Sequence, residues 1–215
     1  MWYKASMRVL SLSLALLIVV LALPAVASAE WFADFYLGPA ITGGSDLKFS
    51  VFGEEQTQTL DGRSSPAFGL RFGRWLEDFK LPWLGLAADV SYFRPAIDVQ
   101  TVPISLLVMA RYGFLKDEEF PNGRLQPYVG IGPALFFNIA SGTIGFNEVN
   151  ETSTDIGLDF RTGLAFQFEQ NWAAFAEYRF THVEPSWRVN VFGVDTSAST
   201  TFNTNHILLG ISYRF

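Results

Sequence analysis

The chain has 215 residues, no cysteine, and 15 basic against 21 acidic residues, which gives a formal net charge of −6 at pH 7. The lack of cysteine excludes a disulfide framework and a cysteine-linked lipid anchor, and the acidic balance argues against a nucleic-acid partner. Aromatic residues make up 16% of the chain, with 21 phenylalanines, which is more than a secreted water-soluble protein has reason to carry.

Residues 1–29 have the three parts of a cleavable signal peptide. Lys4 and Arg8 give a basic start, the apolar run VLSLSLALLIVVLALP follows, and Ala27-Ser28-Ala29 is a small-x-small cleavage site. The apolar run is shorter than the ~20 residues of a spanning helix, so we favour cleavage over an uncleaved anchor. Cleavage after Ala29 would make Glu30 the first mature residue. Because the signal carries two basic and no acidic residues, the mature net charge would be −8.

After residue 30, apolar residues recur at every second position, which predicts β-strands with one apolar face. In the segment FGLRFG, Phe68 and Phe72 fall on one face and Arg71 falls on the other. Each stretch has about 9–14 residues, the length with which a tilted strand crosses a bilayer. Eight such stretches follow one another: 31–42, 66–74, 84–93, 102–114, 126–138, 155–168, 172–182 and 203–215.

Long and short connections alternate between these stretches, with turn signals such as GGSD, FPNG and EQNW. The odd-numbered connections have roughly 23, 8, 16 and 20 residues and the even-numbered ones roughly 9, 11 and 3, as is typical of outer-membrane barrels. We therefore predict an all-β fold: an eight-stranded antiparallel transmembrane β-barrel over residues 30–215, in the cell outer membrane with both ends in the periplasm. The Ser-, Thr-, Asn- and Gly-rich connections 43–65, 139–154 and 183–202 are expected to be loops exposed outside the cell.

Charged residues in these stretches fall on the face opposite to Leu, Ile, Val and Phe. A lipid-facing arginine near the bilayer centre costs about 2–4 kcal/mol, so the charged face is expected to line the lumen. Side chains can fill so narrow a barrel, and an unpaired buried charge is costly, so we expect these residues to pair with one another. The expected lumen charge network comprises five arginines and four acidic residues: Asp34, Arg71, Asp89, Arg111, Asp159, Arg161, Glu177, Arg179 and Arg214. Tyr36, Tyr128 and His206 share this face.

Two water-soluble folds also show period-two alternation. A soluble ligand-binding barrel buries its apolar face and exposes its charged face, but the charged face of this chain is too sparse and too rich in glycine to coat an exterior. A β-sandwich has the same difficulty and leaves open sheet edges. The membrane barrel therefore accounts better for the sequence.

Three segments resemble a known family: LQPYVGIGPALFF, IGLDFRTGLAFQFEQNWAAFAEYRFTHV and NHILLGISYRF. They are similar to the outer-membrane β-barrel domain family, the group around outer-membrane proteins A, X and W. The resemblance covers residues 31–215, and it implies an outer-membrane barrel whose Tyr213 and Phe215 are recognised by the barrel-assembly machinery. It implies no single function, because the family includes adhesins, structural anchors, pores and lipid-modifying enzymes. The peptidoglycan-binding domain of the larger members is expected to be missing.

The function that we expect is structural or surface-interacting. The protein would be a monomer among outer-membrane lipids and lipopolysaccharide, with a charge-filled lumen, exposed loops and no cofactor. A small-solute pore is an alternative, and it requires an open lumen.

A lipid-A-modifying enzyme, acting by acyl transfer or deacylation, is the other alternative. Such chemistry needs a hydroxyl nucleophile and a base, and His182, Glu184 and Ser186 are the candidates at the outer end of the seventh stretch. The deacylase family places a serine two residues after its histidine, whereas this chain has Glu184, so catalysis is not favoured. No metal site is expected, because His182 and His206 fall on opposite faces and cysteine is absent.

Overall fold

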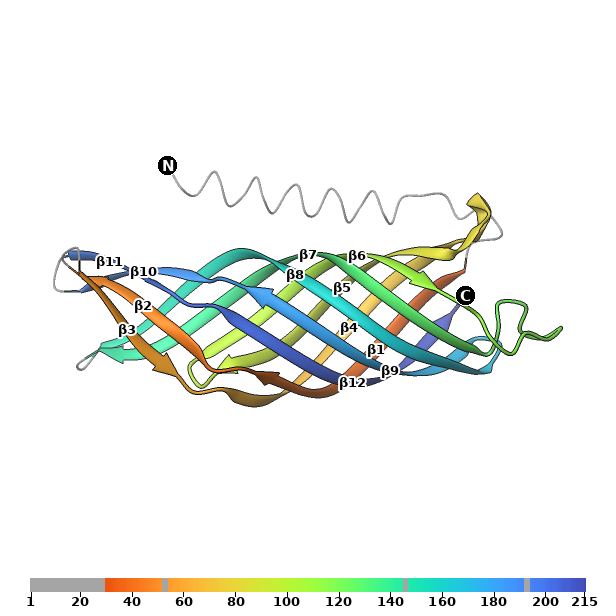
Figure 1. The fold of residues 1–215 in the computed structure, drawn as a ribbon, viewed down its shortest axis with the longest axis horizontal. Coiled ribbons are helices and arrows are strands. Elements are labelled where there is room, and N and C mark those ends of the chain that lie inside the picture. Colours follow the sequence, from red (N-terminus) through yellow and green to blue (C-terminus); the bar gives the residue numbers. More distant parts are fainter. Residues whose placement is uncertain (1–29, 52–53, 145–146, 192–193) are drawn as a thin grey trace.

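The computed structural model describes residues 30–51, 54–144, 147–191 and 194–215. Eight strands form a closed antiparallel barrel in the order β1-β12-β9-β8-β7-β6-β5-β4, which confirms the predicted architecture (Figure 1). The strands are β1 (Trp31–Thr42), β4 (Arg63–Leu76), β5 (Leu81–Ala96), β6 (Val99–Arg111), β7 (Leu125–Ile144), β8 (Asn147–Glu169), β9 (Trp172–Val183) and β12 (Phe202–Arg214). The expected signal peptide, with Ala27 and Ala29, lies outside the described residues.

The barrel strands turn alternate side chains inward and outward, as their sequence period requires. In β9, Phe175, Glu177 and Arg179 are buried, whereas the alternating Tyr178 is 41% exposed. The outward positions of the other strands carry large apolar side chains, such as Leu70 at 58% exposure and Leu209 at 64%. An apolar exterior around a polar interior suits a barrel whose surrounding solvent is lipid. Within the described ranges, no helix is long and apolar enough to span a membrane.

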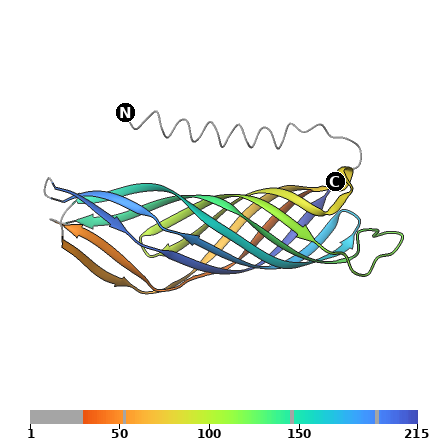
Figure 2. The same ribbon diagram turned by 45° about the horizontal axis from the view of Figure 1, so that its top comes forward.

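The two ends of the barrel differ in construction. We call the end with Glu30 and Phe215 the terminal end; it also carries the 3₁₀ helix η1 (Glu77–Phe79) and the segment 112–124. We call the opposite end the hairpin end, because paired strands project beyond the barrel there (Figure 2).

The projecting strands correct the expectation that long loops join the barrel strands at this end. The connections 43–65 and 183–202 fold into β2 (Ser45–Val51), β3 (Glu54–Leu60), β10 (Ser186–Val191) and β11 (Val194–Ser199), which pair in the order β10-β11-β2-β3. Strands β7 and β8 continue past the barrel as one hairpin, so most of the predicted connection 139–154 belongs to these two strands. Thr and Val suit paired strands, and pairing satisfies backbone groups that a loop would leave to water. The third connection is shorter than the predicted length of roughly eight residues, because β5 and β6 extend to a turn at 97–98.

A row of outward-facing aromatic side chains crosses four neighbouring strands at the terminal end. The Trp31 and Phe72 rings are 5.3 Å apart, Phe72 is 6.2 Å from Phe215, Phe215 is 5.9 Å from Tyr213, and Tyr213 is 4.9 Å from Trp172. Aromatic girdles of this kind mark the membrane interfaces of transmembrane barrels. The row therefore locates one edge of the membrane band.

Glycines inside the barrel make room for the largest lumen side chains. A Cβ added at Gly69 would lie 2.3 Å from the Tyr36 hydroxyl, and one at Gly163 would lie 2.5 Å from the Tyr128 ring. Gly69 faces Tyr36 directly in the register of β1 and β4, and Gly163 faces Tyr128 in that of β7 and β8. The two tyrosines therefore lie flat across a neighbouring strand, with their hydroxyls directed to the centre of the lumen.

Candidate functional site

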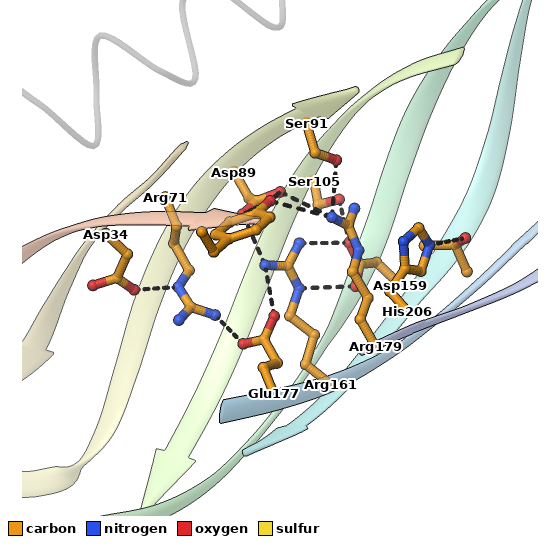
Figure 3. A network of polar contacts seen from close by, with 12 residues as sticks. Asp34, Arg71, Asp89, Ser91, Ser105, Asp159, Arg161, Glu177, Arg179 and His206 are labelled. Atoms are coloured by element: carbon orange, nitrogen blue, oxygen red, sulfur yellow. Dashed lines mark hydrogen bonds and ion pairs between the residues drawn. The ribbon is translucent and has the colours of Figure 1, made fainter. Parts of the chain in front are cut away.

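Seven charged side chains meet in the middle of the lumen, and each comes from an inward position of its strand (Figure 3). We call them the lumen network: Asp34, Arg71, Asp89, Asp159, Arg161, Glu177 and Arg179. The pairing register places Asp34, Arg71 and Asp89 side by side on three consecutive strands, β1, β4 and β5. The remaining four residues lie on β8 and β9, on the opposite wall. The network therefore forms only because the sheet closes.

Arg71 and Glu177 connect the two walls of the barrel. The Arg71 Nε atom donates to Asp34 Oδ2 at 2.6 Å, and its Nη1 atom donates to Glu177 Oε2 at 2.5 Å. The Tyr128 hydroxyl donates to the same Glu177 oxygen at 2.7 Å. Charge-assisted bonds of this length are among the strong ones in proteins, so this chain of contacts holds β4 against β9 across the lumen.

Arg161 is the centre of the network and is 0% exposed. It binds Asp159 through two bonds, Nε to Oδ1 at 2.9 Å and Nη2 to Oδ2 at 2.7 Å, and its Nη1 atom reaches Asp89 at 2.8 Å. Arg161 and Arg179 face each other directly on β8 and β9, an arrangement that would repel without a shared anion. Asp159 supplies that anion, because its Oδ2 atom also lies 2.7 Å from Arg179 Nη2.

Neutral side chains complete the network. The Tyr36 hydroxyl lies 2.8 Å from Asp89 Oδ2, Ser105 donates to Asp159 at 2.6 Å, and Arg179 donates to Ser91 at 2.8 Å. Between the network and the terminal end lies a cavity with a volume of about 20 Å³. That is room for about one water molecule. The paired charges therefore fill the lumen, as the sequence predicts.

Arg111 and Arg214 do not join the lumen network, contrary to the single group of nine residues expected from the sequence. They lie at the terminal end, where both bind Glu30. The five arginines and four acidic residues thus separate into three arginines with four carboxylates in the middle, and two arginines with two new glutamates at the end. The reason is position along the strand. Alternation determines which face a side chain lies on, but two side chains on the inner face can touch only when they lie at the same height along the barrel axis.

Glu30 and Glu77 complete this terminal cluster. Arg111 donates to both oxygens of Glu30 at 2.8 and 2.7 Å and to Glu77 at 3.1 Å, and Asn122 donates to Glu30 at 3.2 Å. Sequence analysis missed Glu30 as a lumen residue, although it has the same parity as the inward residues of β1. Glu77 lies in η1, outside any alternating stretch, so no periodic signal could have found it.

The two glutamates of the terminal cluster have opposite pKa shifts. Burial alone would raise the pKa of Glu30, but the hydrogen bonds and charge of Arg111, with the charge of Arg214, hold it below its usual value. Burial and the neighbouring Glu30 carboxylate raise the pKa of Glu77. Folding therefore favours the ionised form of Glu30 and disfavours the ionised form of Glu77.

We expect Glu30→Gln to lower the free energy of unfolding at pH 7 by about 1–3 kcal/mol, because buried donors of Arg111 lose a charged acceptor. Since the pKa of folded Glu30 is depressed, its contribution is fully present above the ordinary glutamate pKa of about 4.3 and is lost as the pH falls below that value. Urea unfolding of wild type and variant at stepwise pH values measures the difference, which should shrink below about pH 4.3.

Glu77→Gln is the matched control for that experiment. Because the folded protein disfavours the charge on Glu77, we expect this variant to be at least as stable as wild type at pH 7. A loss for Glu30→Gln that stays constant down to low pH would contradict the assignment of an ionic role to Glu30.

The three residues considered for lipid chemistry do not form a catalytic arrangement. His182 Nδ1 lies 2.7 Å from Asn203 Oδ1, and His182 Nε2 lies 3.7 Å from Glu184 Oε1. Ser186 is exposed, and its backbone N–H is directed to Asp155 at 3.4 Å. In the part of the chain that the structure describes, the Ser186 hydroxyl has no contact with His182 that would activate it as a nucleophile.

His206 lies on the inner wall, on the opposite face from His182. Its Nε2 atom is 3.2 Å from the Thr181 hydroxyl, and its ring meets the Phe93 ring edge-on at 4.8 Å. The described residues contain no group of three or more side chains arranged to hold a metal ion. The side chains of the polar interior contact one another through ion pairs and hydrogen bonds.

The sequence matches a family model described as "Outer membrane protein beta-barrel domain" over residues 13–215. A search of curated protein sequences found no match. Among solved structures, the outer membrane protein AlkL in lipid bilayers is 15% identical with a TM-score of 0.57, covering 89% of this chain and 94% of its own. OprG from Pseudomonas aeruginosa is 12% identical with a TM-score of 0.54, covering 87% and 96%. Neisserial surface protein A is 17% identical with a TM-score of 0.51, covering 84% and 97%. At these identities the similarity is one of fold.

Proposed function

Because the chain belongs to the outer membrane protein beta-barrel domain family, we propose that this small outer-membrane barrel acts through the surface beyond its hairpin end and not through its lumen. The lumen network carries this proposal: its side chains are almost fully buried and leave space for about one water molecule beside them. A barrel closed in this way serves as a rigid membrane anchor. The interacting part is then the sheet of β2, β3, β10 and β11, together with the β7–β8 hairpin.

The proposal includes an orientation and a maturation step. We place the hairpin end outside the cell and the terminal end in the periplasm, since long connections face outward in barrels of this kind. We also propose that residues 1–29 are a signal peptide and that cleavage leaves Glu30 at the start of the mature chain. The position of Glu30 in a buried ion-pair cluster supports a boundary just before it.

Single-channel recording in a planar bilayer tests the closed lumen. The wild-type protein should show little or no stable conductance, because passing an ion would require breaking buried ion pairs. OprG could serve as a fold-matched comparison in the same bilayer. Steady and reproducible open steps of the wild-type protein would instead support the small-solute pore.

Site-specific labelling of intact cells tests the orientation. A tag inserted at Gly62, between β3 and β4, should be accessible, and a tag at Glu118 in the segment 112–124 should become accessible only after the cells are broken. Labelling of the Glu118 tag on intact cells would reverse the orientation, and with it the assignment of the projecting sheet to the cell surface.

A further inference from the structure

A groove on the outer wall of the barrel lies between β1 and β4, towards the hairpin end. It has a volume of about 530 Å³ and is lined mainly by apolar side chains and backbone: Leu37, Gly38, Pro39, Ser64, Ser65, Pro66, Ala67 and Phe68. Leu37 is 57% exposed and Phe68 is 49% exposed, so the groove opens to the surroundings of the barrel and not to the lumen. A groove of this kind can receive an acyl chain.

Two prolines that face each other line this groove. Pro39 and Pro66 are directly paired in the register of β1 and β4. Proline has no N–H group and interrupts a ladder, and both outer ladders break at this level. The β1–β12 pairing skips from Leu37 to Ala40, and the β4–β5 pairing ends at Phe68 and Tyr92. The sheet is therefore loosened on both sides of the proline pair.

A polar cluster on β5 and β6 lies beside the groove. Arg94 is exposed, and its Nε atom donates to the Tyr92 hydroxyl at 2.7 Å; the Tyr92 hydroxyl in turn donates to Gln100 Oε1 at 3.3 Å. Among the described residues, no carboxylate forms an ion pair with Arg94. The guanidinium is thus held in place by a tyrosine, and none of the described carboxylates neutralises its positive charge.

Two residues join the polar cluster to the groove. Ser65 lines the groove, and its buried hydroxyl accepts the backbone N–H of Arg94 at 3.0 Å, beyond the point where the β4–β5 ladder ends. The Phe68 ring, also at the groove wall, packs on the Tyr92 ring at 5.5 Å. The apolar groove and the cationic side chain therefore belong to one surface.

The cluster lies at the membrane interface on the side of the hairpin end. Trp83 is an exposed aromatic residue near the terminal end of β5, and Arg94 follows it eleven residues later on the same strand. A tilted strand crosses the apolar band in about 9–11 residues. An exposed arginine is tolerated at that level because its cost falls to about 0–1 kcal/mol near an interface.

We propose that this surface is a binding site for a phosphorylated, acylated glycolipid of the lipid A type. One acyl chain lies in the groove along Pro39 and Pro66, a phosphate group pairs with Arg94, and sugar hydroxyl groups meet Tyr92 and Gln100. The choice of a glycolipid rests on the proposed orientation, which places the site in the outer leaflet. The unpaired guanidinium beside an acyl-sized groove supplies the charge and the shape that such a lipid requires.

Native mass spectrometry of the full-length folded protein, released from detergent, tests this site. The probes are bisphosphorylated lipid A, the same lipid after removal of its phosphates, and phosphatidylglycerol with chains of equal length. We expect one molecule of lipid A to be retained by the wild type, and roughly tenfold weaker retention of the dephosphorylated lipid. Arg94→Gln should cause a similar loss, and Ser64→Trp should block the groove for both lipids. Arg124→Gln, at an exposed arginine of the terminal end, is the charge-matched control and should bind as the wild type does.

Equal retention of the two forms of lipid A by the wild type would overturn the proposal without reference to any variant. Retention by Arg94→Gln equal to that of the wild type would overturn it as well, and stronger binding of phosphatidylglycerol would assign the surface to a glycerophospholipid instead. Binding in detergent does not depend on the orientation in the cell. Mass spectrometry therefore tests lipid binding at this site, and the labelling of intact cells tests the orientation. Either result can be negative without the other.

Discussion

Arg161→Met should lower the free energy of unfolding by about 5 kcal/mol, the largest effect that we expect from any single substitution in this protein. Methionine has a similar length but no charge, so Asp159 loses a two-bond partner and Asp89 loses its bond at 2.8 Å. Both carboxylates would stay buried on opposite walls of the lumen. A loss of this size approaches the whole stability of many folded domains, so a large unfolded fraction is expected.

Urea unfolding in lipid vesicles, with the heat-dependent shift in gel mobility as a second readout, measures this effect. Arg124→Met is the control, because Arg124 pairs only with exposed carboxylates at 3.1 Å and such pairs contribute about 0–1 kcal/mol. The double variant Arg161→Met with Asp89→Asn should recover part of the loss, since it removes one of the two buried carboxylates that have lost Arg161 and share Arg179. Equal and small losses for Arg161→Met and Arg124→Met would show that the lumen network does not stabilise the barrel.

Glu177→Ala should lower the free energy of unfolding by about 3–5 kcal/mol. Arg71 would lose its bond at 2.5 Å and keep only Asp34, and the Tyr128 hydroxyl would lose its acceptor at 2.7 Å. The side chain removed also contacts Arg71 and Tyr128, and these two residues line the small cavity of the lumen. The variant is therefore expected to admit more water and to conduct more than wild type in a planar bilayer.

Glu177→Gln separates the two consequences of this change. Glutamine keeps the volume and one oxygen acceptor but not the charge, so it should destabilise the barrel while leaving conductance close to that of wild type. Glu119→Ala, which removes an exposed partner of Arg124, should change stability by no more than about 1 kcal/mol. Wild-type stability and conductance of Glu177→Ala would contradict a role for this residue in closing the lumen.

The strands and their two faces can be predicted from the amino-acid sequence alone. Alternation of apolar and polar residues follows from the pleat, in which neighbouring side chains point to opposite sides. This local property placed Arg71, Asp89 and Arg161 inside the barrel and Phe68 and Leu209 outside it without knowledge of any contact. The number of strands in the barrel could also be predicted, because each strand has its own run of alternating apolar and polar residues.

Which charged side chains pair with one another depends on how the closed barrel brings distant strands together. Arg71 reaches Glu177 and Arg161 reaches Asp89 across the lumen, from strands that are not neighbours in the sheet. Parity gives the face of a residue but not its height, so Arg111 and Arg214 could not be separated from the lumen network until the register was known.

The hairpin end shows the same limit for backbone pairing. Its segments 43–65 and 183–202 have a polar composition that reads as loop, yet β11 finds a partner in β2 at more than a hundred residues' distance in the chain. The facing pair of Pro39 and Pro66 also arises only when β1 and β4 take their register. Whether a side chain faces lipid or lumen follows from its own polarity and its position in the alternating pattern. Long-range pairing depends on closure of the sheet, which fixes which distant segments lie at the same level.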